Sequence, residues 1–281
     1  MTSRDIIQKI LAENPQLSEE QVLERLTSER ARTGGLLSDE TLLRLIAAKL
    51  GVTVEQYGIC NSGTLSTSRL CAGLNDVTVA GRLIAVFAAR SFEGEKPGKY
   101  ATLMIADNYG ILRVVLWNDK AELVESGELK VGQAVRLSHG YTKEDRYGKV
   151  ELHLGGKSMV EVEPQDKANS YPTAERFTTK IGSLTAEMGA AHVRGVVKEV
   201  FEAKPFTRAD STDGLVMRFT LADDSGSVTA VAWNDKAMEL QKSLKPGVRL
   251  LLVNARVKDT PNGMLEVHVD QSTYINLENA A

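Results

Sequence analysis

The two tryptophans of the chain, Trp117 and Trp233, occur in nearly identical surroundings. Each follows an apolar run and precedes Asn, Asp, Lys and Ala, in the octets VVLWNDKA (114–121) and AVAWNDKA (230–237). An indole ring can stack on a flat partner, and a neighbouring guanidinium such as that of Arg113 can pair with a phosphate. The two octets therefore predict a matched pair of aromatic surfaces.

Alternation along the strand that ends at Trp117 predicts which side chains face outward. The aliphatic set, expected to fill a core, is Leu112, Val114 and Leu116, and in the second copy Val228, Ala230 and Ala232. Arg113 and Trp117 have the opposite parity, as has Trp233. An arbitrary tryptophan is more often a core residue. Here the shared parity, and the absence of surplus aromatic residues in either copy, favour exposed rings.

Other cations and rings are expected near these tryptophans, because the loops between strands one and two and between strands four and five mix the two types, and the outward face of strand two adds Arg218. The first copy supplies Lys99, Tyr100, Lys143, Arg146 and Tyr147, and the second supplies Phe206, Arg208, Arg218, Arg256 and Lys258. A charged hairpin is usually only a solvated turn, so each assignment competes with that interpretation. The second copy has Asn262 where the first has Tyr147, and we expect it to bind more weakly.

Catalytic interpretations have little support. A Glu-x-His pair recurs as Glu151 with His153 and as Glu266 with His268, but no third ligand accompanies it, and a satisfied strand histidine is the favoured interpretation. No phosphate-binding glycine loop or nucleophile motif is found. The two cysteines, Cys60 and Cys71, are expected to be free thiols. We therefore expect no enzyme activity, catalytic residue, cofactor or metal.

The similarity between the copies extends over their whole length. Residues 79–87 match 193–201, residues 106–110 match 222–226, and residues 147–153 match 262–268. Because the matches keep an offset of about 115 residues, the sequence predicts two tandem copies of one domain of common size.

Each copy has the pattern of five strands with a helix after the third. In the first copy, strands are expected at 77–87, 100–106, 111–117, 134–141 and 150–154, and the helix at 121–129; the second helix is expected at 237–244. The Asn-Asp pair after each tryptophan is expected to cap the helix. This order is that of the OB-fold, a small Greek-key barrel. Gly81 and Gly195 are expected to bend the long first strand.

Residues 1–56 have helical periodicity and are expected to form a small bundle for docking or oligomerisation, with direct DNA contact as the weaker alternative. Ser18 to Gln21 has the form of a capping box, and Gly34-Gly35 separates the second helix from the third. The expected class is mainly β, with two OB-folds after a helical bundle. The expected boundaries are 1–56, linker 57–71, first barrel 72–163, linker 164–177 and second barrel 178–278.

Charge limits the class of ligand. The chain has 281 residues and a formal net charge of −3, which argues against coating duplex DNA through phosphate contacts alone. Binding of nucleic acid would then depend on a local groove with base stacking. No apolar run has the length of a membrane span, and the N-terminus lacks the apolar core of a signal peptide, so a cytoplasmic location without membrane contact is expected.

With these features the sequence resembles the DNA-binding domains of the replication protein A large subunit, and in particular the archaeal single-stranded-DNA-binding proteins of that type. The helical segment shares in this: 34–40 (GGLLSDE) followed by 50–52 (LGV) resembles the helical extension of archaeal members. The resemblance implies stacking of bases on Trp117, Trp233 and, in the first copy only, Tyr147. The cysteine-bearing zinc element of some relatives is absent.

The expected function is thus sequence-tolerant binding of single-stranded DNA in replication, repair and recombination. Replication or repair proteins are expected to dock on residues 1–56, and the oligomeric state is left open. RNA binding is the first alternative, because the same platforms accept it. A protein-interaction scaffold is the second, favoured by the near-neutral charge.

Overall fold

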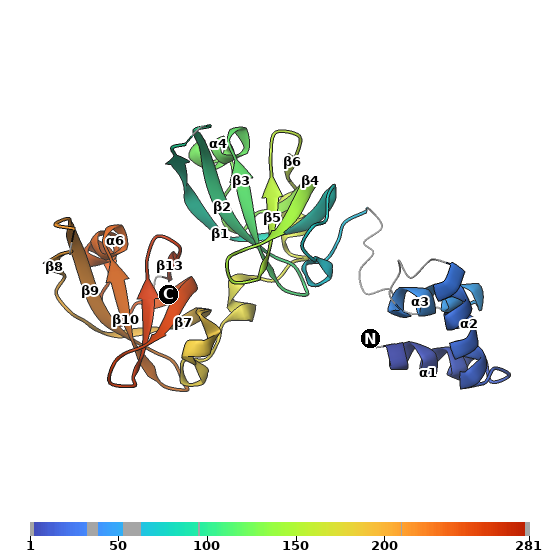
Figure 1. Ribbon diagram of the computed structural model, residues 1–281. Coiled ribbons are helices and arrows are strands. Elements are labelled where there is room, and N and C mark those ends of the chain that lie inside the picture. Colours follow the sequence, from blue (N-terminus) through green and yellow to red (C-terminus); the bar gives the residue numbers. More distant parts are fainter. Residues whose placement is uncertain (1–2, 33–38, 53–62, 95, 209, 279–281) are drawn as a thin grey trace. The chain divides into compact units, whose positions relative to one another are not determined.

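A computed structural model gives the fold and describes all residues except 1–2, 33–38, 53–62, 95, 209 and 279–281 (Figure 1). The chain divides into two compact units, Met1–Ile59 and Cys60–Ala281. Gly34-Gly35, Cys60 and residues 57–62 of the first expected linker lie outside the described residues, whereas Thr67–Arg69 of that linker form a 3-10 helix whose Thr67 N–H donates to Asp107 Oδ2 at 2.7 Å. Cys71 is an exposed free thiol. Within the described residues, no helix has the length and apolar character needed to cross a membrane.

The N-terminal unit consists of three short helices, α1 (Ser3–Glu13), α2 (Glu19–Arg32) and α3 (Asp39–Lys49), as the periodicity predicts. The capping box is formed: the Ser18 N–H donates to Gln21 Oε1 at 3.0 Å, and the Gln21 N–H donates to Ser18 Oγ at 3.3 Å. The helices pack through a small apolar core made of Ile6, Ile7, Ile10, Val22, Leu26, Leu42, Leu43, Ile46, Ala47 and Val52.

The first barrel is built from β1 (Val77–Phe92), β2 (Gly98–Ala106), β3 (Ile111–Trp117), β4 (Ala134–Glu144) and β5 (Val150–Leu154). Strand β1 pairs with β2 and β4, β3 pairs with β2 and runs parallel to β5, and β4 pairs with β5, which closes the ring (Figure 1). The OB-fold prediction is confirmed. A sixth strand on β4, β6 (Met159–Val162), was not predicted.

The second barrel repeats this order with β7 (Ala190–Val200), β9 (Asp213–Ala222), β10 (Ser227–Trp233), β11 (Arg249–Asp259) and β12 (Leu265–Val269). Strands β10 and β12 are parallel, as β3 and β5 are. Two further strands were not predicted: β8 (Lys204–Thr207) pairs with β9, and β13 (Tyr274–Glu278) pairs with β11.

A helix follows the third strand of each barrel, as predicted. These are α4 (Asp119–Glu125), which packs on β1 and β2, and α6 (Asp235–Ser243). The expectation that the first helix reaches Leu129 was wrong. The helix ends earlier because Gly127 adopts a left-handed conformation with φ 74°, and the chain turns so that Leu129 still reaches the core.

The first strand of each barrel changes partner at the predicted glycine. Gly81 pairs with β4, and the next residue, Arg82, pairs with β2 as well. A Cβ atom at Gly81 would lie 2.7 Å from the carbonyl oxygen of Ala106, and one at Gly195 would lie 2.7 Å from that of Ala222. Only glycine allows this approach, so the bend that closes each barrel depends on it.

The predicted aliphatic faces fill the barrels: Leu112, Val114 and Leu116 belong to the first core, and Val228, Ala230 and Ala232 to the second. A further apolar cluster joins the barrels and contains Ile84, Ala85, Met104, Ala106, Ala174, Leu251 and Val253. Residues 164–177, expected as a linker, are folded into α5 (Gln165–Ala168) and the 3-10 helix Ala174–Phe177. Arg82 donates to the carbonyl oxygen of Ala168, which fixes this segment to β1.

Candidate nucleic-acid interface

Trp117 lies at the end of β3, half-buried and outside the aliphatic core. Its indole N–H donates to Nδ1 of His153 at 3.1 Å. The ring meets Phe92 edge-on at 5.9 Å between centroids and lies tilted to Tyr100, also at 5.9 Å. These contacts hold one edge of the indole on the barrel wall, while the ring remains partly exposed.

Trp233 has the same environment at the end of β10. Its indole N–H donates to Nδ1 of His268 at 3.1 Å, and Phe206 packs edge-on at 5.6 Å. Arg208 lies over the Phe206 ring at 5.4 Å and donates to Asn234 Oδ1 at 2.8 Å. The sequence repeat thus extends to the contacts around each tryptophan.

The asparagine after each tryptophan has a different role from the one expected. The expectation that its side chain caps the helix was wrong: Asn118 and Asn234 have φ of 49° and 50°, and their side chains turn to the neighbouring strand. Asn118 Oδ1 accepts the N–H of Lys99 at 3.2 Å, and Asn234 Oδ1 accepts that of Leu215 at 3.3 Å. Each asparagine ties the end of the tryptophan strand to the second strand of its barrel.

The parallel pairing of β3 with β5 places the Glu-x-His pair beside the tryptophan. Arg113 lies opposite Glu151, and Val115 lies opposite His153. Arg113 forms an ion pair with the buried carboxylate of Glu151. Burial lowers the pKa of His153, outweighing the opposing charge of Glu151. The Arg113 cation is therefore partly neutralised within the groove.

The groove around Trp233 distributes its charges differently. It is a hollow of about 370 Å³ lined by Phe206, Arg208, Trp233, Asn234, Arg256, Lys258, His268 and Asp270. Arg256 pairs with Asp270. Burial acts to raise the pKa of Asp270, but hydrogen bonds from Ser272 and the charge of Arg256 bring that pKa below its usual value. Four of the predicted residues, Phe206, Arg208, Arg256 and Lys258, are thus brought together with Trp233.

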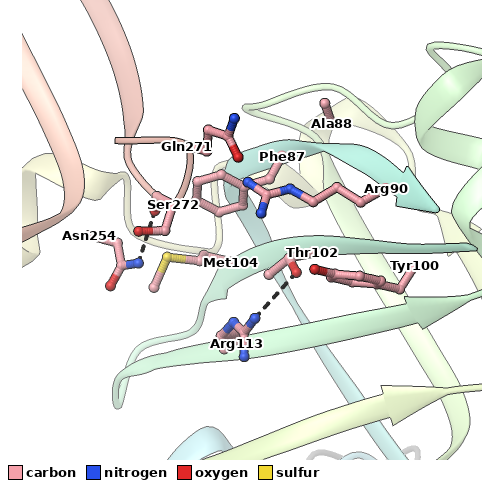
Figure 2. Close-up of a pocket in the computed structure, with 10 residues that line it drawn as sticks. All are labelled: Phe87, Ala88, Arg90, Tyr100, Thr102, Met104, Arg113, Asn254, Gln271 and Ser272. Carbon is pink, nitrogen blue, oxygen red and sulfur yellow. Dashed lines mark hydrogen bonds between the residues drawn. The ribbon is translucent and has the colours of Figure 1, made fainter. Parts of the chain in front are cut away.

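A second hollow, of about 80 Å³, lies where the outer face of β1–β3 meets the second barrel (Figure 2). The first barrel contributes Phe87, Ala88, Arg90, Tyr100, Thr102, Met104 and Arg113, and the second contributes Asn254, Gln271 and Ser272. Figure 2 shows the Arg113 guanidinium directed at Thr102, 3.5 Å from its hydroxyl. The surface beside Trp117 therefore continues towards the second barrel.

The other predicted residues are more dispersed. Lys143 lies over the Tyr141 ring at 5.3 Å, and Tyr141 stacks on His153 at 5.2 Å, which connects this cation to Trp117. The tip of the β4–β5 hairpin carries Tyr147, 68% exposed, with the Arg146 guanidinium 4.8 Å from its ring.

Two predicted cations are placed differently. Lys99 forms an ion pair with Glu125 of α4 at 2.9 Å, which holds its charge on the helix. Arg218 is exposed on β9 opposite Val231, and it is not part of the lining of the second groove. Neither residue is gathered around a tryptophan in the way the other cations are.

Three residues of this surface were missed in the sequence: His153, His268 and Tyr141. The recurrence of Glu-x-His in both copies was the available signal. It was interpreted as a structural histidine because the proximity of β5 to β3 does not show in the sequence. Phe92 was also missed, because it was expected in a loop, whereas β1 extends to it.

Fold and groove together define a class of protein with two OB-fold barrels, each carrying a tryptophan at the end of its third strand. The family of OB-fold nucleic acid binding domains matches residues 77–156 and 191–274, so the chain belongs to this family. It is 30% identical over 210 residues to the replication factor A of Methanothermobacter thermautotrophicus, which covers 71% of this chain and 26% of that protein. The predicted resemblance to archaeal replication protein A-type proteins is confirmed. The chain spans about a quarter of the length of this relative.

A solved structure has the same fold, and a second one aligns with part of the chain. A replication protein A heterotrimer bound to single-stranded DNA aligns with 77% of this chain and 52% of its own, with a TM-score of 0.55 and 15% identity. The second OB-fold domain of replication protein A from Methanococcus maripaludis aligns with 37% of this chain and 97% of its own, with a TM-score of 0.32 and 27% identity.

Proposed function

We propose that this chain binds single-stranded DNA without strong sequence preference, as part of DNA replication. The observation that supports this best is the repeated groove: two half-buried indoles, each beside a second aromatic ring and cationic side chains. Stacking on such rings is tolerant of sequence because every base has a flat face. The replication factor A to which the chain is similar gives the biological context.

In this proposal, bases stack on Trp117, Trp233 and Tyr147. The cations that contact phosphates are Arg113, Lys143 and Arg146 in the first barrel and Arg208, Arg218, Arg256 and Lys258 in the second. Tyr100 and Phe206 support the indoles from the side, while Lys99 contributes only if its pairing with Glu125 gives way. Roughly 4–16 nucleotides per OB-fold give a site of about 8–30 nucleotides.

Functions in repair and recombination, and the docking of replication or repair proteins on residues 1–56, belong to the same proposal. They follow from the expected activity, because each of these processes exposes single strands. The N-terminal helices offer a separate folded unit for such contacts.

The test is a competition titration with the full chain. A labelled oligothymidine is bound first, and unlabelled DNA, RNA of matched sequence and duplex DNA are then added while fluorescence polarisation is followed. We expect single-stranded DNA to displace the label at the lowest concentration and duplex DNA at the highest. Equal competition by RNA would favour the RNA-binding alternative, because it would show that the groove does not distinguish the 2′-hydroxyl. No binding of any oligonucleotide would favour a protein-interaction scaffold.

A further inference from the structure

The same three side chains are linked in both barrels. The indole N–H of Trp117 donates to Nδ1 of His153 at 3.1 Å, and Trp233 donates to His268 at the same distance. The other imidazole nitrogen, Nε2, lies 3.3 Å from Glu151 Oε2 in the first barrel and 3.2 Å from Glu266 Oε2 in the second. The Trp–His–Glu arrangement is thus repeated, but only His268 is hydrogen-bonded to its carboxylate: Nε2 of His153 is buried and has no aligned hydrogen-bond partner among the described residues.

The chemistry of these groups fixes the tautomer of the histidine. An indole nitrogen can only donate a hydrogen bond, so Nδ1 must be the unprotonated acceptor. The single proton of the neutral imidazole is then on Nε2, where it faces a carboxylate oxygen. The donors and acceptors therefore follow one direction: the indole N–H donates to the imidazole, and the imidazole N–H points to the carboxylate.

The tryptophan and histidine rings are nearly parallel and form one flat surface. The Trp117 and His153 rings are inclined by only 18°, and those of Trp233 and His268 by 27°. In the first barrel the surface continues to Tyr141, inclined by 23° to His153. An indole held in this way has lost its rotational freedom before a ligand arrives, so binding need not restrict it again.

A histidine with a purely structural role looks different in this chain. Nδ1 of His192 accepts the backbone N–H of Asn254 at 3.0 Å, as expected of a histidine that satisfies a backbone donor. His153 and His268 instead accept from the ring that we assign to base stacking.

We propose that His153 and His268 are positioning residues, which hold the indoles of Trp117 and Trp233 in the orientation that receives a base and which act only as neutral imidazoles with the proton on Nε2. This deepens the proposed function and depends on it for the identity of the ligand. The positioning itself is a property of the free protein and can be measured without DNA.

The proposal implies a pH dependence. A proton taken up at Nδ1 would remove the lone pair that accepts from the indole. Around His153 stand Glu151 on β5, Arg113 on β3 and Lys143 and Tyr141 on β4; around His268 stand Glu266 on β12, Asp270 after it, and Arg256 and Lys258 on β11. Burial, followed by Lys258, lowers the pKa of His268, as burial does for His153. The indole bonds should therefore persist at neutral pH and break only in acid, below the ordinary histidine pKa of about 6.5.

The test separates the acceptor from the ring. His153→Phe keeps a flat ring without an acceptor, and His153→Asn places an amide oxygen near the position of Nδ1 without the ring. In the full chain, the two indole N–H signals are followed by ¹H–¹⁵N NMR, and the affinity for oligothymidine is measured in parallel. His139→Asn is the control, because His139 is an exposed residue of the same barrel that pairs with Asp76.

We expect His153→Phe to speed exchange of the Trp117 indole proton with water and to weaken binding about threefold to tenfold, the cost of ordering one side chain on binding. His153→Asn should restore much of both, and His139→Asn should change neither. An indole signal unaffected by His153→Phe would overturn the proposal. So would equal losses of affinity in the Phe and Asn variants, because restoring the hydrogen-bond acceptor would then have restored nothing.

A second test uses the unmodified chain, so its outcome does not depend on whether the variants fold. As pH is lowered, the indole N–H signal and the histidine ring signals should change at one common pH in each barrel. Titration of the histidines with no change in the indole signals would contradict the proposal. If the indole bonds behave as expected but no oligonucleotide binds, the positioning stands and the proposed function fails.

Discussion

One cation of each groove is matched by an acid. Arg113 pairs with Glu151, and Arg256 pairs with Asp270. The acids offset part of the attraction that these cations would exert on phosphates, in keeping with the net charge of −3. We therefore expect stacking to supply more of the affinity than charge does. Salt should weaken binding less steeply than in proteins that release many counterions.

At the residue scale, the half-buried His192 predicts a loss of stability in acid. Burial, followed by the charge of Lys149, lowers its pKa to about 4. The unfolded chain, with a histidine pKa of about 6.5, binds more protons between these values, so the free energy of unfolding falls as pH drops from about 7 to about 4. The shift corresponds to about 3 kcal/mol.

Urea unfolding at a series of pH values measures this loss. His192→Asn keeps an acceptor for the Asn254 N–H but cannot titrate, so its stability should fall less steeply over the same range. The difference between the two chains isolates His192 from the other titrating groups. Identical slopes in both chains would show that His192 is protonated equally in the folded and unfolded states.

At the element scale, the geometry of each groove depends on how the first strand bends. The bend lets β1 pair with β4 up to Arg82 and with β2 from Arg82 onward, which closes the barrel. The two barrels also differ at the hairpin between their fourth and fifth strands. The first carries the exposed Tyr147 there, and the second has Asn262. The first barrel thus has one more ring on which a base can stack.

Gly81→Ala tests the bend. The added methyl group would lie 2.7 Å from the carbonyl oxygen of Ala106, and relieving such overpacking costs about 1–3 kcal/mol. We expect unfolding at a lower urea concentration, while the free energy of unfolding keeps the same dependence on urea concentration. Gly156→Ala is the matched control, because its methyl group would meet no described atom within 4 Å. Equal stability of the two variants would show that the close approach does not constrain the strand.

Features set by neighbouring residues could be predicted from the sequence, whereas contacts between strands far apart in the sequence could not. Alternation placed Trp117 correctly apart from the aliphatic core, and the repeat predicted that Trp233 would share its environment. The bond from Trp117 to His153 could not be predicted, because it joins strands that pair in parallel across 36 positions of sequence. The turned side chain of Asn118 was missed for the same reason: its partner lies on another strand.

At the scale of the whole molecule, the two barrels share an apolar cluster that includes Met104 and Leu251. The shared contacts keep the grooves in one folded unit, so a strand bound in one raises the effective concentration of its continuation at the other. Two sites of modest affinity then bind a long strand more tightly than either site does alone. Long oligonucleotides should gain from this linkage, and short ones should not.

The most direct test of the account is the affinity for oligothymidine of the double variant Trp117→Ala with Trp233→Ala, compared with the unmodified chain. Stacking contributes roughly 1–3 kcal/mol per base, so losing both rings should weaken binding by a factor of tens to thousands while circular dichroism stays unchanged. In the unmodified chain, the same titration should quench the indole fluorescence. Full affinity in a folded double variant would contradict the claim that bases stack on these two rings.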